Sequence, residues 1–230
     1  MDGEVVRAGF ERKFLVPESD AERLLSAVGH LLSPDPLAGP SGEYTVASLY
    51  LDTPDLAAYQ RELGGKWRLR RYGDAGEVFA EFKARPAPGK VHKRRTSLSR
   101  ESCLALPHTA EAGWFTRAIC KHSLTPVCLV SYRRHAFVGM VDGEAIRLTL
   151  DRNIRAASHR AYVVPISLNG DGTSLTEGRI LEIKFARELP ASLNAVLETL
   201  GLLPASFSKY RTAVEKTTSF PSPGSLWAGQ

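Results

Sequence analysis

The sequence predicts an α+β protein built around an antiparallel sheet, and three observations lead to this class. Several runs with period-two alternation follow one another with only short turns between them, which is typical of hairpins. A few segments with helical periodicity are interspersed among them, and no linker is long enough to separate two domains. We therefore expect one domain over residues 1–216, followed by a disordered tail over residues 217–230 that is rich in Ser, Pro and Gly.

The individual elements follow from the spacing of apolar residues and from turn signals. Strands are predicted at Phe10–Val16, Tyr44–Leu51, Lys66–Tyr72, Glu77–Arg85, Lys90–Ser99, Val127–Val138, Ala145–Arg155, Tyr162–Ser167 and Arg179–Arg187. Helices are predicted at Glu18–Leu32, Pro54–Leu63, Thr109–His122, Ala191–Leu200 and Phe207–Lys216. Ser19 with Glu22 has the spacing of a capping box, and Thr53 is expected to cap the second helix.

Composition excludes several classes of protein. The chain has 230 residues, of which 43% are hydrophobic and 24% charged, and these ordinary globular values exclude wholesale disorder. No apolar run is long enough for a transmembrane helix, and Met1–Arg12 contains no signal-peptide core. Three cysteines without a CxxC motif argue against a disulfide framework and against structural zinc. We therefore expect a protein of the reducing cytoplasm.

The net charge of +5 is unevenly distributed along the chain. Residues 61–100 contain 12 Lys and Arg against 4 Asp and Glu, a net charge of +8, so the remainder is slightly acidic. The chain also contains 21 Arg and only 9 Lys. A GC-rich genome would explain part of this ratio, but it would not explain the clustering. Arginine binds phosphate and carboxylate groups in a bidentate manner, so the segment favours an anionic ligand.

In several predicted strands, most of the charged residues share one face, whereas VSYRRHAF (130–137) carries bulky and charged side chains on both faces. In KWRLRRY, Lys66, Arg68 and Arg70 lie on the face opposite Trp67 and Leu69. The strands EVFAEFKAR and ILEIKF separate charged from apolar positions in the same way. The pattern is compatible with a solvated outer face, with a charged concave sheet, or with a barrel that has a polar lumen and helices on its apolar exterior. Trp67 and Phe82 are expected to pack outward beneath helices.

Carboxylates between the cations make a nucleic-acid ligand less favoured. Glu81 lies two residues from Lys83, and Glu182 lies two residues from Lys184. Such carboxylates repel a phosphodiester backbone, but they suit a site where Mg²⁺ or Mn²⁺ binds phosphate oxygens. The sequence contains no P-loop, no GxGxxG, no GxSxG and no pair of histidines with zinc spacing. The remaining polar chemistry is that of Arg and Lys with Glu and Asp on strands.

An ordered set of motifs resembles the VTC domain, the polyphosphate polymerase domain of the CYTH-like triphosphate tunnel enzymes. The motifs are ERKF (11–14), SLYLDT (48–53), WRLRRYG (67–73), FAEFKAR (79–85), KVHKRRTSLSRE (90–101), SYRRHAF (131–137), IRLTLDRNI (146–154), LEIKF (181–185) and FSKYR (207–211). The resemblance covers residues 10–216. It implies an antiparallel β-barrel or tunnel of about eight strands, with a polar, basic lumen and surrounding helices, which binds triphosphate and polyphosphate.

The resemblance also implies roles for individual residues, and each role is carried over from a matching motif. The catalytic phosphate contacts would come from Lys13, Arg68, Arg70, Lys83, Arg134 and Lys209. Further substrate contacts would come from Lys93, Arg95, Tyr132, Arg147 and Ser208. Glu182 would be the main ligand of Mn²⁺ or Mg²⁺, with Glu11 and Glu81 as weaker candidates for the metal or for its surroundings. The alternative role of both is an ion pair that spaces neighbouring cations, and for Glu81 the two roles are equally favoured. Asp151 is expected to be structural.

The implied activity is transfer of the γ-phosphoryl group of ATP to a growing polyphosphate chain. A triphosphate hydrolase of the same fold and a polyphosphate-binding module without turnover are the alternatives. Hydrolytic CYTH relatives carry ExExK on the first strand, whereas this chain has Gly9 in place of the first Glu, which counts against a generic triphosphatase. The chain has no room for the regulatory and transmembrane domains of eukaryotic VTC polymerases, so it resembles the bacterial stand-alone form.

Overall fold

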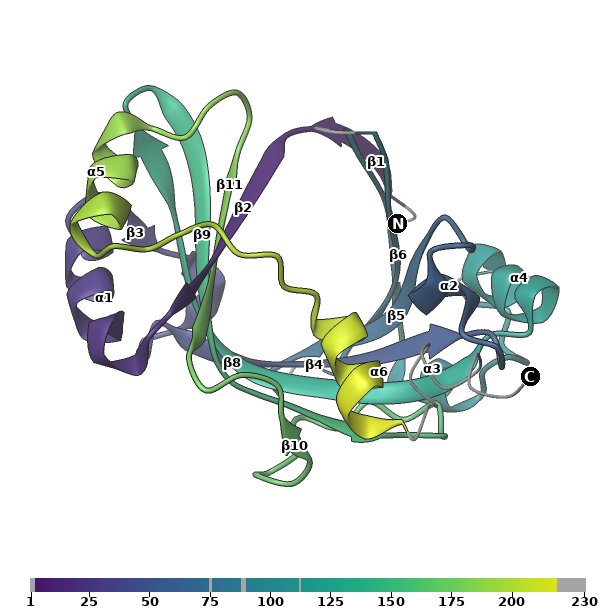
Figure 1. Cartoon of the computed structure of the whole chain (residues 1–230). Helices are drawn as coiled ribbons and strands as arrows, with labels where there is room; N and C mark the ends of the chain where they lie inside the picture. The colour runs from purple at the N-terminus through teal and green to yellow at the C-terminus, as the bar shows by residue number, and fades with distance from the viewer. Residues whose placement is uncertain (1–2, 75, 88–89, 112, 219–230) are drawn as a thin grey trace, which may run out of the picture.

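The computed structural model describes residues 3–74, 76–87, 90–111 and 113–218, within which eleven strands form one sheet (Figure 1). The strands are β1 (Gly3–Ala8), β2 (Phe10–Val16), β3 (Ser33–Pro34), β4 (Glu43–Asp52), β5 (Gly65–Tyr72), β6 (Val78–Ala87), β7 (Lys90–Leu98), β8 (Thr125–Val141), β9 (Glu144–Ser158), β10 (Thr173–Ser174) and β11 (Arg179–Phe185). The α-helices are α1 (Ala21–Gly29), α2 (Ala57–Gln60), α3 (Arg100–Leu104), α4 (Gly113–His122), α5 (Ala191–Thr199) and α6 (Lys209–Thr217).

The sheet curves around a central space, which we call the lumen. Its strand order is β1-β7-β6-β5-β4-β8-β9-β11-β2, with β3 and β10 paired to β8 and β9, and every pairing is antiparallel. The two edge strands, β1 and β2, are consecutive in the chain and are joined at Gly9 (Figure 1). The predicted α+β tunnel fold is therefore confirmed, with one correction. The sheet contains more strands than expected, and ladder hydrogen bonds do not close it between β1 and β2.

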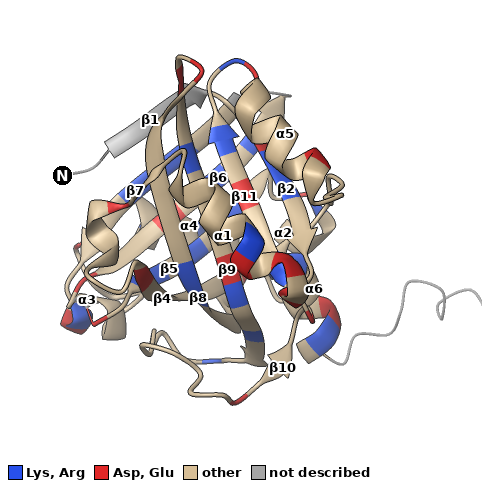
Figure 2. Ribbon diagram, turned by 90° about the vertical axis from the view of Figure 1, so that its left-hand side faces the viewer, with Lys and Arg blue, Asp and Glu red and all other residues tan. Residues whose placement is uncertain are grey.

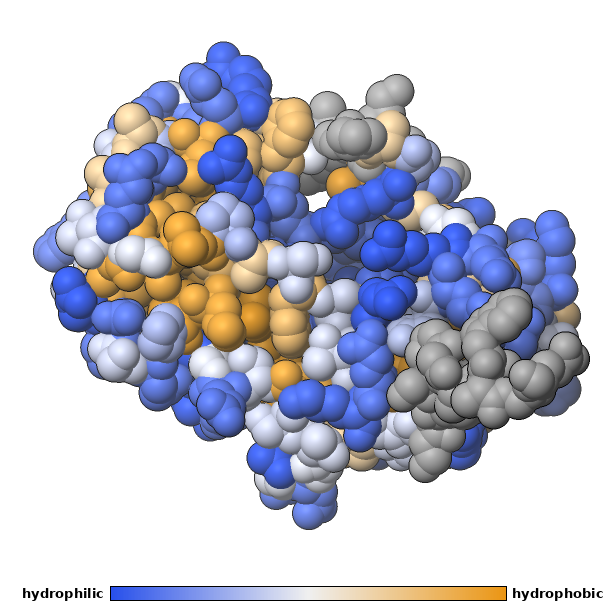
Figure 3. All heavy atoms as spheres, viewed as in Figure 1, coloured by the Kyte–Doolittle hydropathy of each residue, from blue (hydrophilic) through white to orange (hydrophobic). Residues whose placement is uncertain are grey.

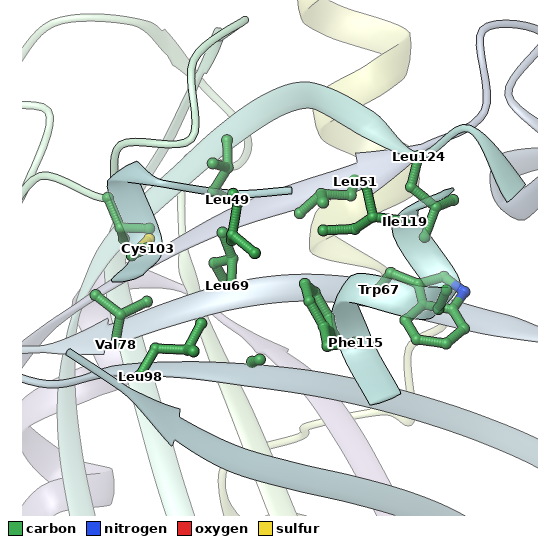
Figure 4. Close-up of a cluster of buried hydrophobic side chains, with 14 of the residues drawn as sticks. Leu49, Leu51, Trp67, Leu69, Val78, Leu98, Cys103, Phe115, Ile119 and Leu124 are labelled. Atoms are coloured by element: carbon green, nitrogen blue, oxygen red, sulfur yellow. The ribbon is translucent and has the colours of Figure 1, made fainter. Parts of the chain in front are cut away.

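Helices α3 and α4 cover the outer face of β4, β5 and β6. Trp67 and Leu69 of β5 point away from the lumen into a cluster of buried apolar side chains that includes Phe115 of α4 (Figure 4). The Trp67 ring lies 5.7 Å from that of Phe115 and 4.4 Å from that of Phe82. The outward packing predicted for Trp67 and Phe82 is confirmed. The apolar side chains on the outer face of these strands thus form a core under the two helices.

A second outer core lies beneath α1 and α5, on the opposite side of the lumen (Figure 1). Leu181 and Ile183 of β11 pack there with Leu24 of α1 and Leu193 of α5, and all four side chains are almost fully buried. These β11 residues alternate with Glu182, which faces the lumen. The period-two pattern therefore sorts apolar side chains to the helices and charged ones to the interior.

Helix α6 packs against the inner face of the sheet rather than the outer one. The ring of Tyr210 stacks on that of Tyr50 from β4 at 4.9 Å, and Ala213 and Val214 are buried in the same cluster. The hydroxyl of Tyr210 donates a hydrogen bond to the carboxylate of Asp52 at the end of β4. The start of α6 is thereby held beside the lumen.

One predicted strand does not form, because its segment makes other tertiary contacts in place of strand pairing. Tyr162–Ser167 was expected to be a strand, but it forms none and instead crosses the outer face of the sheet. There the Tyr162 hydroxyl donates a hydrogen bond to the Leu124 carbonyl at 2.7 Å. The alternation in this segment reflects side-chain packing on the α4 side of the sheet. The strand β1 and the helix α3 had not been expected.

The first two helices begin later than their cap signals predicted. Residues Glu18–Asp20 form a 3-10 turn, so α1 starts at Ala21 and the capping box expected at Ser19 is absent. Leu56 adopts a left-handed conformation with φ of 62°, which delays α2 to Ala57. The Thr53 hydroxyl accepts a hydrogen bond from the backbone N–H of Ala57 at 2.8 Å, as expected of a cap. The Asp52 carboxylate accepts two more from backbone N–H groups of α2.

Helix α6 ends at Thr217, and most of the tail predicted to be disordered lies outside the described residues. Within the described part of the chain, no helix combines the length and apolar character needed to cross a membrane.

The cysteines provide a test of this fold. Burial raises the pKa of the Cys103 thiol to about 11 and that of the Cys128 thiol to about 12, whereas Cys120 is exposed. Because the thiolate is the reactive form, a thiol reagent at pH 8 should modify one cysteine in the native protein and all three after denaturation. Cys120→Ser should abolish the native reaction, and rapid modification of either buried thiol would contradict the fold.

Candidate functional site

The concave face of the sheet carries an excess of positive charge. Figure 3 shows a hollow lined by hydrophilic residues, and Figure 2 shows Lys and Arg positions spread over neighbouring strands. Among the described residues on this face, twelve cationic side chains contact five carboxylates or Ser208. The cations are Lys13, Lys66, Arg68, Arg70, Lys83, Arg85, Lys93, Arg95, Arg134, Arg147, Lys184 and Lys209. Positive potential is thus concentrated inside the sheet.

The first group of cations surrounds Glu81 of β6, which has no exposed surface. Its carboxylate oxygens lie 2.6 Å from Arg68, 3.0 Å from Lys93, 3.5 Å from Arg95 and 4.0 Å from Arg70. Burial by itself would raise the pKa of Glu81, but the surrounding cations outweigh burial and hold that pKa well below its usual range. Glu81 is therefore ionised, and it orients four predicted phosphate-binding side chains from its two neighbouring strands, β5 and β7.

The second group surrounds Asp151 of β9, which is also fully buried. Arg134 of β8 donates two hydrogen bonds to its carboxylate at 2.6 and 2.9 Å, and Lys209 at the start of α6 donates a third at 2.6 Å. The Tyr132 ring lies beneath this group, with its centroid 4.7 Å from Lys209 Nζ and 5.2 Å from Arg134 Cζ. Asp151 thus holds two predicted catalytic cations in fixed positions.

The third group surrounds Glu11 of β2. Its carboxylate oxygens lie 2.6 Å from Arg85, 3.2 Å from Lys83 and 3.3 Å from Lys13. Burial and the neighbouring Glu182 carboxylate would raise the pKa of Glu11. The nearby lysines outweigh both effects and lower that pKa to about 2. Glu11 therefore connects the edge strand β2 with β6, two strands that do not pair in the sheet.

Glu182 of β11 lies beside this group. One of its oxygens is 2.8 Å from Lys184 Nζ, and the other is 3.7 Å from Lys13 Nζ. Burial alone would raise the pKa of Glu182, yet Lys184 and Lys13 hold that pKa well below its usual range. Glu182 is thus an ionised carboxylate with two cationic neighbours.

Glu11 and Glu182 are the carboxylates best arranged to hold a divalent cation. A single atom, Lys13 Nζ, lies 3.3 Å from one carboxylate and 3.7 Å from the other, so a positive charge already bridges them. Mg²⁺ commonly binds one or two carboxylates and completes its shell with water and phosphate oxygens, so this donor set fits. The described residues contain no cluster of three or more metal-ligating side chains. The four cations around Glu81 favour a role for it in spacing those cations.

The segment that leads into α6 brings further polar groups to the lumen. Ser208 accepts a hydrogen bond from Lys66 Nζ at 2.8 Å and caps the helix by accepting another from the Arg211 backbone. Lys13 Nζ donates to the Phe207 carbonyl at 3.0 Å. The predicted residues Ser208 and Lys209 therefore reach the lumen from a helix terminus rather than from a strand.

Arg147 is set apart from the three groups. It lies on the lumen face of β9, but its guanidinium pairs at 2.6 Å with Asp35, a buried residue that follows β3. Asp35 was not among the predicted site residues, because it lies in a loop where strand alternation gives no signal. Lys66, Arg85 and Lys184 were also missed as site residues, although they share a face with predicted residues on β5, β6 and β11.

Comparisons with known proteins place these observations in a family. The family model of the VTC domain matches residues 9–218. A solved structure of a candidate adenylate cyclase from Bacillus halodurans superimposes with a TM-score of 0.55 at 16% identity, covering 88% of this chain and 95% of the other. A candidate adenylyl cyclase from Hippeastrum, described as having a dominant triphosphatase activity, gives 0.53 at 15% identity, covering 94% and 97%. No curated protein sequence matches the chain.

The Glu81 group can be tested through stability. In Glu81→Gln, the cations around this position lose a buried countercharge, and breaking a buried ion pair typically costs about 3 kcal/mol or more. We expect the free energy of unfolding in urea to fall by about that amount. Glu77→Gln, an exposed position just before β6, is the matched control and should change the stability little. Equal stability of the two variants would contradict the structural role of Glu81.

Proposed function

The chain belongs to the VTC domain family, and on this premise we propose that it is an inorganic polyphosphate polymerase. It would transfer the γ-phosphoryl group of ATP to the end of a polyphosphate chain and release ADP. The observation that carries the proposal is the excess of lumen cations over carboxylates. A linear polyanion supplies the negative charge that this surface lacks, and it can lie along the lumen.

The proposed reaction needs positioning more than covalent help from the protein. An oxygen of the terminal phosphate attacks the γ-phosphorus, the bond between that phosphorus and the β–γ bridging oxygen breaks, and ADP leaves with the electron pair. The polymer thereby gains one phosphate. Because the attacking oxygen is already anionic, no strong general base is required. A lumen built mainly from Arg and Lys suits such a step.

Buried donors held in fixed positions are the main contribution that we assign to the protein. Two carboxylates restrict the movement of four cations through hydrogen bonds or ion pairs. Glu81 contacts Arg68 and Arg70, and Asp151 contacts Arg134 and Lys209. Preorganised donors stabilise charge that develops in a transition state without reorganising at the moment of reaction. We assign these four cations to the transferred and leaving phosphates. Half-buried Lys93 and Arg95 would extend the phosphate path, as would Lys83, Arg147, Tyr132 and Ser208.

A divalent cation, Mn²⁺ or Mg²⁺, would be held by Glu182 and Glu11, with Lys13 displaced from between them. When bound, it would neutralise charge on the β- and γ-phosphate oxygens. Glu182 would be the principal ligand because it has fewer cationic neighbours than Glu11.

A triphosphate hydrolase is the second candidate. The fold shared with the Hippeastrum protein favours it, since that protein is described as having a dominant triphosphatase activity. In this case water rather than a phosphate would attack the γ-phosphorus. Gly9 stands where the hydrolytic relatives are expected to have a carboxylate, so we place this candidate second.

The reaction product separates the candidates. Incubation with ATP and Mn²⁺ or Mg²⁺ should yield a polymer that an exopolyphosphatase digests, together with ADP in proportion to the phosphate incorporated. Orthophosphate without polymer would identify a hydrolase. Binding of polyphosphate with neither product, across metals and primers, would identify a binding module.

The metal assignment predicts a separation of activity from anion binding. Loss of the main metal ligand in Glu182→Ala should lower kcat by about 100-fold or more, because a catalytic metal supplies several kcal/mol of charge stabilisation. Affinity for tripolyphosphate measured without metal should remain, since the cations are retained. Glu188→Ala, an exposed position after β11, is the control. Full activity of Glu182→Ala would contradict the assignment.

A further inference from the structure

Three aromatic side chains lie at the same end of three neighbouring strands. Tyr44 is the second residue of β4, Tyr72 is the last residue of β5, and Phe79 is the second residue of β6. Because these strands are antiparallel neighbours, the three positions meet at one end of the lumen. We call this group the aromatic mouth.

The rings of the aromatic mouth face the lumen and touch one another. Each of the three rings is an even number of residues away from a lumen-facing residue of its own strand, so it lies on the same face. These lumen-facing residues are Ser48 for Tyr44, Arg70 for Tyr72 and Glu81 for Phe79. The ring centroids are 6.0 Å apart between Tyr44 and Tyr72, and 5.8 Å apart between Tyr72 and Phe79. All three side chains are only half-buried. They form an apolar surface that is open to a ligand, unlike Trp67, which is covered by α4.

Cations from the phosphate-binding groups cover part of this surface. The Arg95 guanidinium lies 3.6 Å from the centroid of the Phe79 ring and 5.4 Å from that of Tyr72, and Arg70 lies 5.8 Å from Tyr72. Arg95 and Arg70 also contact Glu81. The aromatic mouth is therefore continuous with the first group of lumen cations.

The opposite end of the same strands has a different character. There the lumen-facing side chains are Lys66 on β5 and Lys83 and Arg85 on β6, which contact Ser208 and Glu11. The lumen-facing side chains that β5 and β6 contribute at that end are therefore cations, whereas those at the other end include both aromatic rings and cations. A ligand that consists only of phosphate has no planar group to stack on the faces of half-exposed rings, whereas a ligand with a planar base beside its phosphates would use both surfaces.

We propose that the aromatic mouth binds the base of the nucleoside triphosphate, whose phosphates then extend inward along Arg70 and Arg68. The inference rests on the proposed use of a nucleoside triphosphate in the lumen. Bases stack on aromatic rings and on arginine guanidinium planes, and such stacking depends little on which base is present. The site therefore selects a nucleotide over a bare triphosphate, and it discriminates weakly among the bases.

Two ligands of similar charge test the proposal. ATP and methyl triphosphate both carry a triphosphate monoester, and they differ in the nucleoside. Dissociation constants measured calorimetrically with Mg²⁺, under conditions without turnover, should be lower for ATP than for methyl triphosphate in the wild-type chain. Phe79→Ala should weaken ATP binding by roughly 5- to 100-fold, the usual loss for one stacked base, and leave methyl triphosphate binding almost unchanged.

Tyr72 provides the matched pair of variants. Tyr72→Phe retains the ring and should retain the preference for ATP, whereas Tyr72→Ala should reduce it. Unchanged binding of methyl triphosphate shows in the same experiment that each variant has folded. The proposal that the aromatic mouth binds the base would be wrong if the wild-type chain bound the two ligands equally, or if Phe79→Ala lost affinity for both in parallel. Neither result would contradict the proposed function. Failure of both ligands to bind the wild-type chain would overturn both proposals.

Discussion

The structure depends on the sharing of a few carboxylates by a larger number of cations inside a curved sheet. Like charges confined at low dielectric repel strongly, so a lumen lined by Lys and Arg alone would favour unfolding. Glu81, Asp151, Glu11 and Glu182 relieve this repulsion, and each lies beside two to four cations. One carboxylate for every cation would remove the repulsion and with it the affinity for an anion. The observed imbalance keeps the cations ordered and leaves a positive field for the ligand.

The polar lumen also determines where the helices pack. A sheet whose concave face is charged can form an apolar core only on its convex face, and alternate residues of each strand supply that face. Two outer cores result, one beneath α3 and α4 and one beneath α1 and α5. Helix α6 is the exception, because it enters the inner face and covers the apolar part of that face around Tyr50.

Strand alternation was enough to predict which side chains share a face of a strand, because period two assigns every residue of a strand to one face. It left open whether that face meets solvent or a lumen, and only the family resemblance implied a lumen. It placed Arg68 and Arg70 opposite Trp67 without any knowledge of the tertiary fold. Features that depend on contacts between distant segments could not be predicted in this way. The pairing of Arg147 with Asp35 brings a loop to the lumen. Tyr162–Ser167 alternates like a strand, yet it meets no partner strand.

The start of α6 shows why the site requires nearly the whole chain. Tyr210 is anchored by Asp52, the last residue of β4, whose carboxylate also holds the backbone of α2. This anchor places Lys209 on Asp151, where it meets Arg134 from β8. Lys209 therefore contributes to the lumen only when β4, β8 and β9 have already paired. Because these contacts join residues far apart in sequence, formation of the anion site is coupled to completion of the fold, and no single hairpin could form the site alone.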